Sequence, residues 1–273
     1  MDLSSALEIV TQTDPGMVRS HNEDAVMANS TAGVVVLADG MGGYNAGEVA
    51  SGMATALLGT ELEQRFSAVP AHQLLADGRT SAEGALAEKI ALANSSIYQA
   101  AQSQPQYAGM GTTLVSAVFS DNRMTVAHIG DSRLYRFRGG ELSQVTRDHS
   151  LLQEQIDSGL ITREQARLSQ NKNLVTRALG VDPSVEPEIH AYDVEIGDIY
   201  LFCSDGLNDM VEDEEIGMTV GMLSANLELC AAQLVQMAND NGGRDNVSVI
   251  LVRVKEDFAV PRGWWSRILS WFK

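Results

Sequence analysis

Apolar runs that end in an acidic residue and a glycine turn recur along this chain. Continuous apolar runs lead into Asp39-Gly40 and into Asp205-Gly206, and a similar run leads into Gly130-Asp131. Short runs of this kind, rich in branched residues and followed by a turn, are typical of buried strands. A carboxylate at the end of such a strand is poorly solvated and needs a partner. The pattern therefore predicts strands whose acidic ends share a source of positive charge.

The same pattern divides the chain into strands and helices. It predicts strands over residues 8–14, 19–24, 34–39, 112–119, 123–129, 134–138, 141–145, 198–203 and 247–254. It predicts helices over about residues 46–64, 82–102 and 226–239. Because the strands come in clustered pairs and the helices stand apart from them, the fold class is α+β, a sandwich rather than a series of alternating βαβ units.

The polar stretch after the predicted strand over residues 141–145 has little strand character. Residues 147–180 predict short helical pieces that form a flap over another part of the molecule. We expect one domain over residues 1–257 and a distinct amphipathic tail over residues 258–273, which contains all three tryptophans. A chain of 273 residues can bury a large core without disulfide bonds.

Composition narrows the class of protein. The net charge of −17 and the pI near 4.6 argue against nucleic acid or anionic lipid as a partner of the main domain. The two cysteines, Cys203 and Cys230, lie in a predicted strand and a predicted helix, which favours buried, reduced thiols. The first residues lack the pattern of a signal peptide, and no apolar run reaches the ~18 residues of a membrane span. We therefore expect a soluble, cytoplasmic protein and, since nothing in the main domain demands more, a monomer.

The acidic strand ends suggest a specific chemistry. Asp39, Asp131 and Asp205 follow strands, and Asp245 stands just before the last one. Basic residues near these positions are too few to neutralise them all. If the carboxylates converge, a hard divalent cation with oxygen ligands would compensate their charge. The chain is therefore interpreted as a metalloenzyme.

Six short motifs give this interpretation a family. They are Arg19-Ser20-His21-Asn22-Glu23-Asp24, Asp39-Gly40-Met41-Gly42-Gly43, Gly111-Thr112-Thr113, Gly130-Asp131-Ser132-Arg133, Ser204-Asp205-Gly206-Leu207 and Gly243-Arg244-Asp245-Asn246. In this order they resemble the bacterial branch of the PPM, or protein phosphatase 2C-like, metal-dependent serine/threonine phosphatases. The resemblance covers about residues 8–255. It implies a four-layer α-β-β-α sandwich, in which two packed antiparallel sheets are flanked by helices and the metal ions lie at one end.

The resemblance also implies a set of metal ligands. Two Mn²⁺ or Mg²⁺ ions would be bridged by Asp39, and the Gly40 carbonyl would ligate one of them. Asp205 and Asp245 would complete the other. Glu23 and Asp24 would act through metal-bound waters. Because adjacent side chains on a strand face opposite sides, Asp24 is the better candidate of these two.

Further site positions follow from the resemblance, and each has a structural alternative. Asp131 and Asp209, together with Asp205, would form a third and weaker metal site. Asp131 could instead be held by a salt bridge to Arg133. Arg19 would clamp the phosphate through its planar guanidinium, and the alternative is a surface ion pair.

The general acid is not assigned by the motifs. Animal relatives carry a histidine directly after the Asp-Gly pair, where this chain has Met41. A metal-bound water is the default candidate. His21 and His128 are interpreted as packed or hydrogen-bonded structural residues, and a role of His149 on the substrate side is left open.

The implied function is hydrolysis of phosphoserine and phosphothreonine in proteins, by direct attack of a water activated by two metal ions. The expected partners are phosphorylated proteins, with a bacterial serine/threonine kinase as counterpart. The alternative is a catalytically silent regulator that uses the fold for binding. That alternative predicts eroded metal ligands, whereas Asp39, Asp205 and Asp245 are all present.

Two segments remain open in their roles. The tail could dock on its own domain, bind a partner protein or touch a membrane surface. The flap region carries a local excess of basic residues, which would either steer phosphorylated substrates or form a solvated surface. These residues are Arg147, Arg163, Arg167, Lys172 and Arg177.

Overall fold

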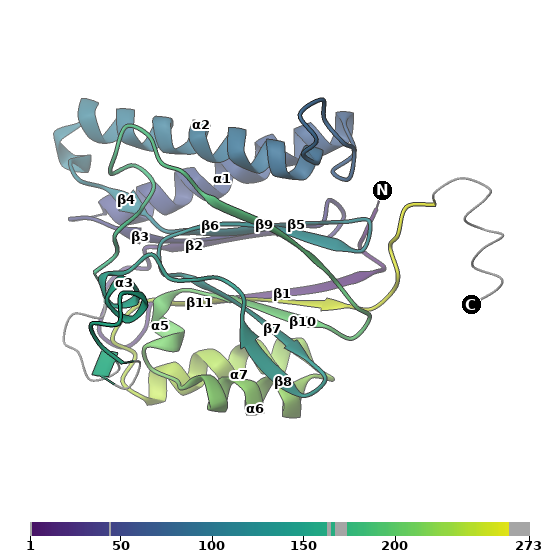
Figure 1. The fold of residues 1–273 in the computed structure, drawn as a ribbon. Coiled ribbons are helices and arrows are strands. Elements are labelled where there is room, and N and C mark those ends of the chain that lie inside the picture. Colours follow the sequence, from purple (N-terminus) through teal and green to yellow (C-terminus); the bar gives the residue numbers. More distant parts are fainter. Residues whose placement is uncertain (1, 44, 163–164, 167–173, 262–273) are drawn as a thin grey trace.

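The computed structural model describes residues 2–43, 45–162, 165–166 and 174–261, and every structural statement below refers to these residues. Two antiparallel sheets lie face to face, and a helical layer covers the outer side of each (Figure 1). This arrangement confirms the predicted four-layer α-β-β-α sandwich. The tail residues 262–273 and the flap residues 163–164 and 167–173 lie outside the described part, so the predictions for them stay predictions.

The first sheet has the strand order β1-β11-β10-β7-β8, and the second has β2-β3-β5-β6-β9, with the short β4 paired to β3. The strands of the first sheet are β1 (Leu7–Asp14), β7 (Arg133–Arg138), β8 (Glu141–Gln144), β10 (Ile199–Cys203) and β11 (Val247–Val254). Those of the second are β2 (Asp24–Asn29), β3 (Val34–Met41), β4 (Gly111–Thr112), β5 (Leu114–Ser120), β6 (Arg123–Ile129) and β9 (Glu188–Asp193).

Helices α1 and α2 cover the second sheet, and α6 and α7 cover the first (Figure 1). The helices are α1 (Ala46–Ala68), α2 (Ser81–Ser103), α3 (Leu151–Asp157), α5 (Asp205–Asn208), α6 (Asp213–Leu223) and α7 (Leu227–Asp240), with a 3₁₀ turn at Pro105–Tyr107. A capping box starts α2: the Thr80 hydroxyl accepts from the Glu83 amide, and the Glu83 carboxylate accepts from the Thr80 amide.

The continuous apolar runs are explained by burial on both faces of the central strands. In β3, Val34, Val36 and Ala38 pack against α1 and α2. The intervening Val35 and Leu37 pack between the two sheets. Strand β11 repeats this arrangement with its own alternate residues. A strand in the middle of a four-layer sandwich has no solvent face, and so its sequence has no polar alternation.

One predicted strand is wrong, and β9, α5 and α6 were not predicted. Residues 19–23 form a loop, and β2 begins only at Asp24. Strand β9 was missed because it is only half-buried and carries charged residues at both ends. Helices α5 and α6 were missed because one is a single turn and the other starts with an acidic run, Asp213-Glu214-Glu215. That acidic run is favourable at a helix N-terminus.

The other strands and helices predicted for the main domain are present. Strands 123–129 and 247–254 have the predicted bounds, and both cysteines are buried and free. In the described part of the chain, no helix has the length and apolarity that crossing a membrane requires.

Candidate metal centre

Four of the predicted ligands meet at one end of the sandwich. Asp24 and Asp39 are direct register partners on β2 and β3 of the second sheet. Asp205 begins α5 after β10, and Asp245 precedes β11, so both come from the first sheet. The pKa of Asp39 is raised well above its ordinary value, by loss of solvent and then by the charges of the three other carboxylates and of Asp131. The fold thus brings mutually repelling carboxylates together.

Asp24 shows most directly what this crowding means. Loss of solvent raises its pKa to about 6, although the Ser204 hydroxyl donates to its Oδ2 at 2.8 Å. Its other oxygen, Oδ1, is buried without a hydrogen-bond partner, and so is Oε1 of Glu23. Buried carboxylate oxygens without donors are costly unless a cation lies beside them. An all-oxygen donor set of this kind fits Mn²⁺ or Mg²⁺.

Glu23 and Asp24 occupy different places, but strand alternation does not apply to the pair, because residue 23 lies in the loop before β2. Asp24 lies opposite Asp39 at the start of β2. Glu23 lies one residue before the strand, and its Oε1 would be 2.6 Å from a Cβ added to Gly47 at the beginning of α1. Burial raises the pKa of Glu23 as well. Glu23 therefore lies at the helix side of the cluster.

Backbone geometry holds Asp39 and Gly40 in place. The Thr112 hydroxyl and the Thr113 amide both donate to the Asp39 carbonyl, at 2.8 and 2.9 Å. A Cβ at Gly40 would lie 2.1 Å from the Gly47 carbonyl oxygen. Only glycine at position 40 lets α1 approach the end of β3 so closely. Gly111 and Thr112 form the short, buried β4, and β5 begins only at Leu114, so the predicted strand over residues 112–119 is interrupted at Thr113.

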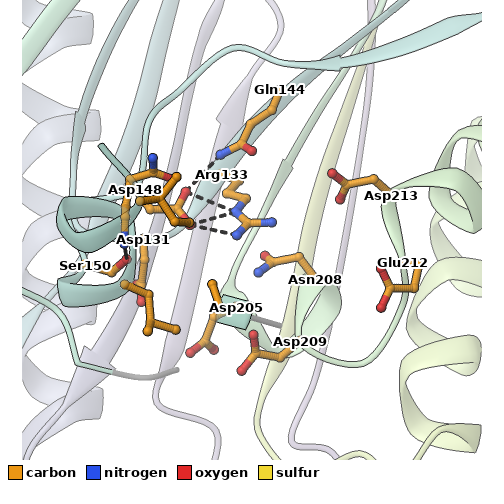
Figure 2. A pocket seen from close by; sticks show the side chains of 14 residues that line it. Asp131, Arg133, Gln144, Asp148, Ser150, Asp205, Asn208, Asp209, Glu212 and Asp213 are labelled. Carbon is orange, nitrogen blue, oxygen red and sulfur yellow. Dashed lines mark hydrogen bonds and ion pairs between the residues drawn. The ribbon is translucent and has the colours of Figure 1, made fainter. Parts of the chain in front are cut away.

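Asp131, Asp205 and Asp209 line a pocket of about 200 Å³ next to this cluster (Figure 2). Burial raises the pKa of Asp131 to about 7, and the charges of Asp148 and Asp209 add to the shift. The salt bridge from Arg133 to Asp131, which was the alternative interpretation, is not formed. The Arg133 guanidinium instead binds both oxygens of Asp148, with Nη2 at 2.7 Å from Oδ2.

The Arg19 guanidinium forms an ion pair with a predicted metal ligand. Its Nη2 lies 2.6 Å from Oδ2 of Asp245, and the arginine side chain is 50% exposed. The ion pair considered as an alternative for Arg19 is thus present, and it lies at the rim of the acidic cluster. Only Nη2 of the guanidinium takes part in this bond.

Asn246 belongs to the last motif, and its side chain has a structural role that the motif did not predict. Its Nδ2 donates to the carbonyls of Pro15 and His21, at 3.0 and 2.8 Å. Its Oδ1 accepts from the Glu23 amide at 2.7 Å. Asn246 therefore fixes the loop that carries Arg19. Its place directly after a candidate ligand was the available signal.

The two histidines that were interpreted as structural differ in burial, and two basic residues of the flap lie near acidic partners. His128 is buried and bonded to the Arg147 carbonyl, as a structural histidine should be, whereas the side chain of His21 is exposed. In the flap, Arg147 pairs with Asp157, and Arg177 lies 3.9 Å from Glu188. The other basic residues of the flap, Arg163, Arg167 and Lys172, lie outside the described residues.

Comparison with known proteins adds to this geometry. The family model for "Protein phosphatase 2C" matches residues 18–249. The serine/threonine protein phosphatase PstP of Mycobacterium tuberculosis is 39% identical over 248 residues; these cover 91% of this chain but only 45% of PstP, so the chain spans about half the length of that relative. The serine/threonine phosphatase Stp of Listeria monocytogenes is 38% identical, with 88% of this chain and 93% of Stp covered.

One solved structure is informative about metals. The catalytic domain of PstP, in complex with two manganese ions, aligns with a TM-score of 0.80 and 37% identity. The alignment covers 92% of this chain and 99% of that one. The range of the family model, residues 18–249, includes all four aspartates of the acidic cluster.

Proposed function

This chain is a member of the protein phosphatase 2C family, and on that premise we propose that it is a metal-dependent phosphatase that hydrolyses phosphoserine and phosphothreonine in proteins. The observation that carries the proposal is the convergence of Asp24, Asp39, Asp205 and Asp245 on one end of the sandwich, with a raised pKa at Asp39 and a donorless oxygen on Asp24. A merely structural cluster of this kind would cost stability without return.

The residues proposed to hold two Mn²⁺ or Mg²⁺ ions are Asp39 and the Gly40 carbonyl, with Asp205 and Asp245 from the other sheet. Asp24 and Glu23 would contribute through water. Asp131 and Asp209, with Asp205, are proposed for a third and weaker position. When bound, the ions would supply an activated water and positive charge for the phosphoryl oxygens.

Arg19 is proposed to orient the phosphate. It lies half-exposed at the rim of the cluster, on a loop that Asn246 holds through three hydrogen bonds. Its guanidinium has donors besides the Nη2 that binds Asp245, and a planar fork matches two phosphate oxygens. Residue 41 cannot protonate the leaving oxygen because methionine carries no acidic proton. We propose water of the site as the proton source.

The wider setting is also proposed. Residues 1–257 would form the phosphatase domain, residues 147–180 its flap, and residues 258–273 a separate tail that binds a partner protein or a membrane surface. The substrates would be proteins phosphorylated by a serine/threonine kinase in the cytoplasm, and the enzyme would act as a monomer. No observation favours a catalytically silent regulator, since none of the proposed ligand positions has lost its oxygen donor.

The test is hydrolysis of p-nitrophenyl phosphate and of a phosphothreonine peptide, in Mn²⁺, in Mg²⁺ and in EDTA. We expect turnover of both substrates that requires metal and disappears in Asp39→Asn. The matched control is Asp193→Asn, which makes the same change at a side chain that is 89% exposed on β9. Folded, metal-loaded protein without turnover would contradict the proposal.

A further inference from the structure

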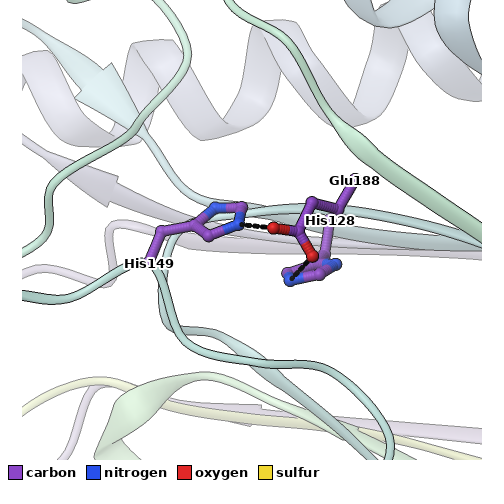
Figure 3. Close-up of side chains that lie close together, drawn as sticks. All are labelled: His128, His149 and Glu188. Carbon is purple, nitrogen blue, oxygen red and sulfur yellow. Dashed lines mark ion pairs between the residues drawn. The ribbon is translucent and has the colours of Figure 1, made fainter. Parts of the chain in front are cut away.

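A second cluster of titratable side chains lies beside the candidate metal centre. It consists of His128 on β6, His149 at the start of the flap and Glu188 on β9 (Figure 3). The Nε2 of His149 lies 3.1 Å from Oε1 of Glu188, and the Nε2 of His128 lies 4.0 Å from Oε2. The two rings are stacked, with centroids 4.8 Å apart and planes at 17°. Both histidines are almost fully buried.

This cluster has the residue types of a metal site. However, protons on the histidine ring nitrogens and the stacking of the two rings argue against metal binding. The Nε2 of His128 must carry a proton, because it donates to the Arg147 carbonyl at 2.9 Å. The Nδ1 of His149 accepts from the Gly130 amide at 3.1 Å, so the proton of its neutral ring is on Nε2, facing Glu188. Ring-nitrogen lone pairs lie in the ring planes, and those of two stacked rings do not converge on one ion.

The hydrogen bonds of His149 point instead to the turn before Asp131. Besides the bond to Nδ1, the Gly130 carbonyl accepts from the His149 amide at 2.9 Å. Gly130 has φ +101°, and a Cβ there would lie 2.7 Å from Thr113. The Gly130 turn is therefore tight on one side and bonded twice to His149 on the other. The next residue is Asp131, which is 6% exposed.

His149 also connects that turn to the flap. Its carbonyl accepts from the Thr176 amide at 2.8 Å, and its neighbour Ser150 forms a β-bridge with Val175. His149 thus bonds to the turn of Asp131 and to the returning segment of the flap, and its Nε2 lies 3.1 Å from a carboxylate oxygen of Glu188 on the edge strand β9. Sequence motifs gave no sign of this connection because its partners lie 19 to 39 residues away from His149.

We propose that His149 is a positioning residue for the weaker metal position: its ring, oriented by Glu188, holds the Gly130 turn so that the Asp131 carboxylate is presented to the ion. This inference rests on the proposed function, since it concerns the same site. The charged side chains that influence the pKa of His149 are Glu188, Arg177 and Asp148, and the ring of His128 stacks on it. Burial lowers the pKa of His149, which keeps Nδ1 free to accept the Gly130 amide at neutral pH.

The test compares two variants that each preserve half of the ring's hydrogen bonding. In His149→Asn, the side-chain oxygen stands near the place of Nδ1 and can still accept from Gly130. In His149→Gln, the amide reaches toward Glu188, and the acceptor for Gly130 is lost. Mn²⁺ binding is measured by calorimetry on the full chain, alongside the Mn²⁺ dependence of p-nitrophenyl phosphate hydrolysis, with Asp131→Asn as the reference.

We expect wild-type protein to show a weaker Mn²⁺ binding event that Asp131→Asn removes. His149→Gln should weaken that event about 10-fold, the usual scale for residues that orient a ligand. The tighter events should not change, and His149→Asn should stay within about 3-fold of wild type. A wild type without a weaker event, or two histidine variants with equal affinity, would overturn the inference.

Glu188→Ala keeps the proposal testable if a histidine variant does not fold. Without the carboxylate, the His149 proton is no longer held on Nε2, and the weaker event should again lose affinity, by about 10-fold. Unchanged affinity in this variant would also overturn the inference. If wild type binds Mn²⁺ but turns over neither substrate, the proposed function fails, and the calorimetry still judges the role of His149.

Discussion

Strand β10 carries an aspartate at each end, and the two behave in opposite ways. Asp198 precedes the strand and is 1% exposed. Nε and Nη2 of Arg138 each lie 2.6 Å from one of its oxygens, and the Glu195 amide and the Tyr200 hydroxyl also donate to it. Burial alone would raise the pKa of Asp198, but these donors outweigh it and lower the pKa.

Asp205 follows the same strand and has a different environment. Loss of solvent raises its pKa well above the ordinary value, and the neighbouring charges of Asp131, Asp209, Asp245 and Asp24 raise it further. Burial therefore does not identify a functional carboxylate. The charge of the neighbouring groups differs between the two, because Asp198 binds the Arg138 guanidinium whereas Asp205 lies among four other aspartates.

The strongest test of this difference is Asp205→Asn. We expect kcat/KM on a phosphothreonine peptide to fall by about 1000-fold, since metal ions contribute several kcal/mol to the transition state. The melting temperature in EDTA should rise, because one repelling charge has been removed. Near-normal turnover in the variant would show that Asp205 is as structural as Asp198.

The opposite variant, Asp198→Ala, should lower stability and leave chemistry intact. Breaking a buried ion pair leaves the Arg138 guanidinium without its main partner, and we expect a loss of about 3 kcal/mol in the free energy of unfolding. Urea denaturation measures this loss, and kcat of the folded variant should stay within about 2-fold of wild type. A large drop in kcat without loss of stability would show that Asp198 acts in the chemistry and not in holding the fold.

Arg19→Lys tests whether the ion pair at the rim is functional. A lysine can keep the charge beside Asp245 but cannot bind two phosphate oxygens with a planar fork. We expect kcat/KM to fall by about 30-fold, the effect of one good charge-assisted bond. Arg123→Lys, at an exposed ion pair on β6, is the matched control and should have no effect.

The smallest effect concerns how the melting temperature of the metal-free protein, in EDTA, depends on pH. The pKa values of Asp24 and Asp131 are raised from 3.8 to about 6 and about 7. Stability from these groups is fully present below their unfolded pKa and is lost as pH rises through the folded pKa. In EDTA, the melting temperature should therefore fall by several degrees between pH 4 and pH 7.

Asp198 contributes nothing to that slope, because its lowered pKa places its own loss of stability below pH 4. Thermal melts across the range, with and without excess Mn²⁺, measure the difference. The ion should remove most of the decline. A melting temperature in EDTA that rises from pH 4 to pH 7 would contradict the raised pKa values of the cluster.

The sequence carried enough information for most of the fold and for the acidic cluster. Strands such as β3 and β11 were predictable because burial on both faces produces unbroken apolar runs. Asp39 and Asp205 were predictable because each follows such a run and precedes a glycine. Strand β9 was not, since a half-exposed edge strand leaves no such pattern.

The supporting contacts could not be predicted, because they join residues far apart in the chain. Asn246 bonds to Pro15 across 231 positions, and Ser204 bonds to Asp24 across 180. The pairing of Arg133 with Asp148 rather than with its neighbour Asp131 likewise depends on how β7 and the flap meet in space. Local patterns locate the ligands, and tertiary structure decides how they are held.

Strand order has a consequence for the timing of synthesis. Strand β11 lies between β1 and β10, and Asp245 and Asn246 stand just before it. At ~5–20 residues per second, Asn246 leaves the ribosome roughly 10–40 s after Asp39. Until then β1 lacks its neighbour, and the loop with Arg19 lacks its anchor. The nascent chain therefore cannot complete the first sheet or anchor the Arg19 loop until β11 has emerged.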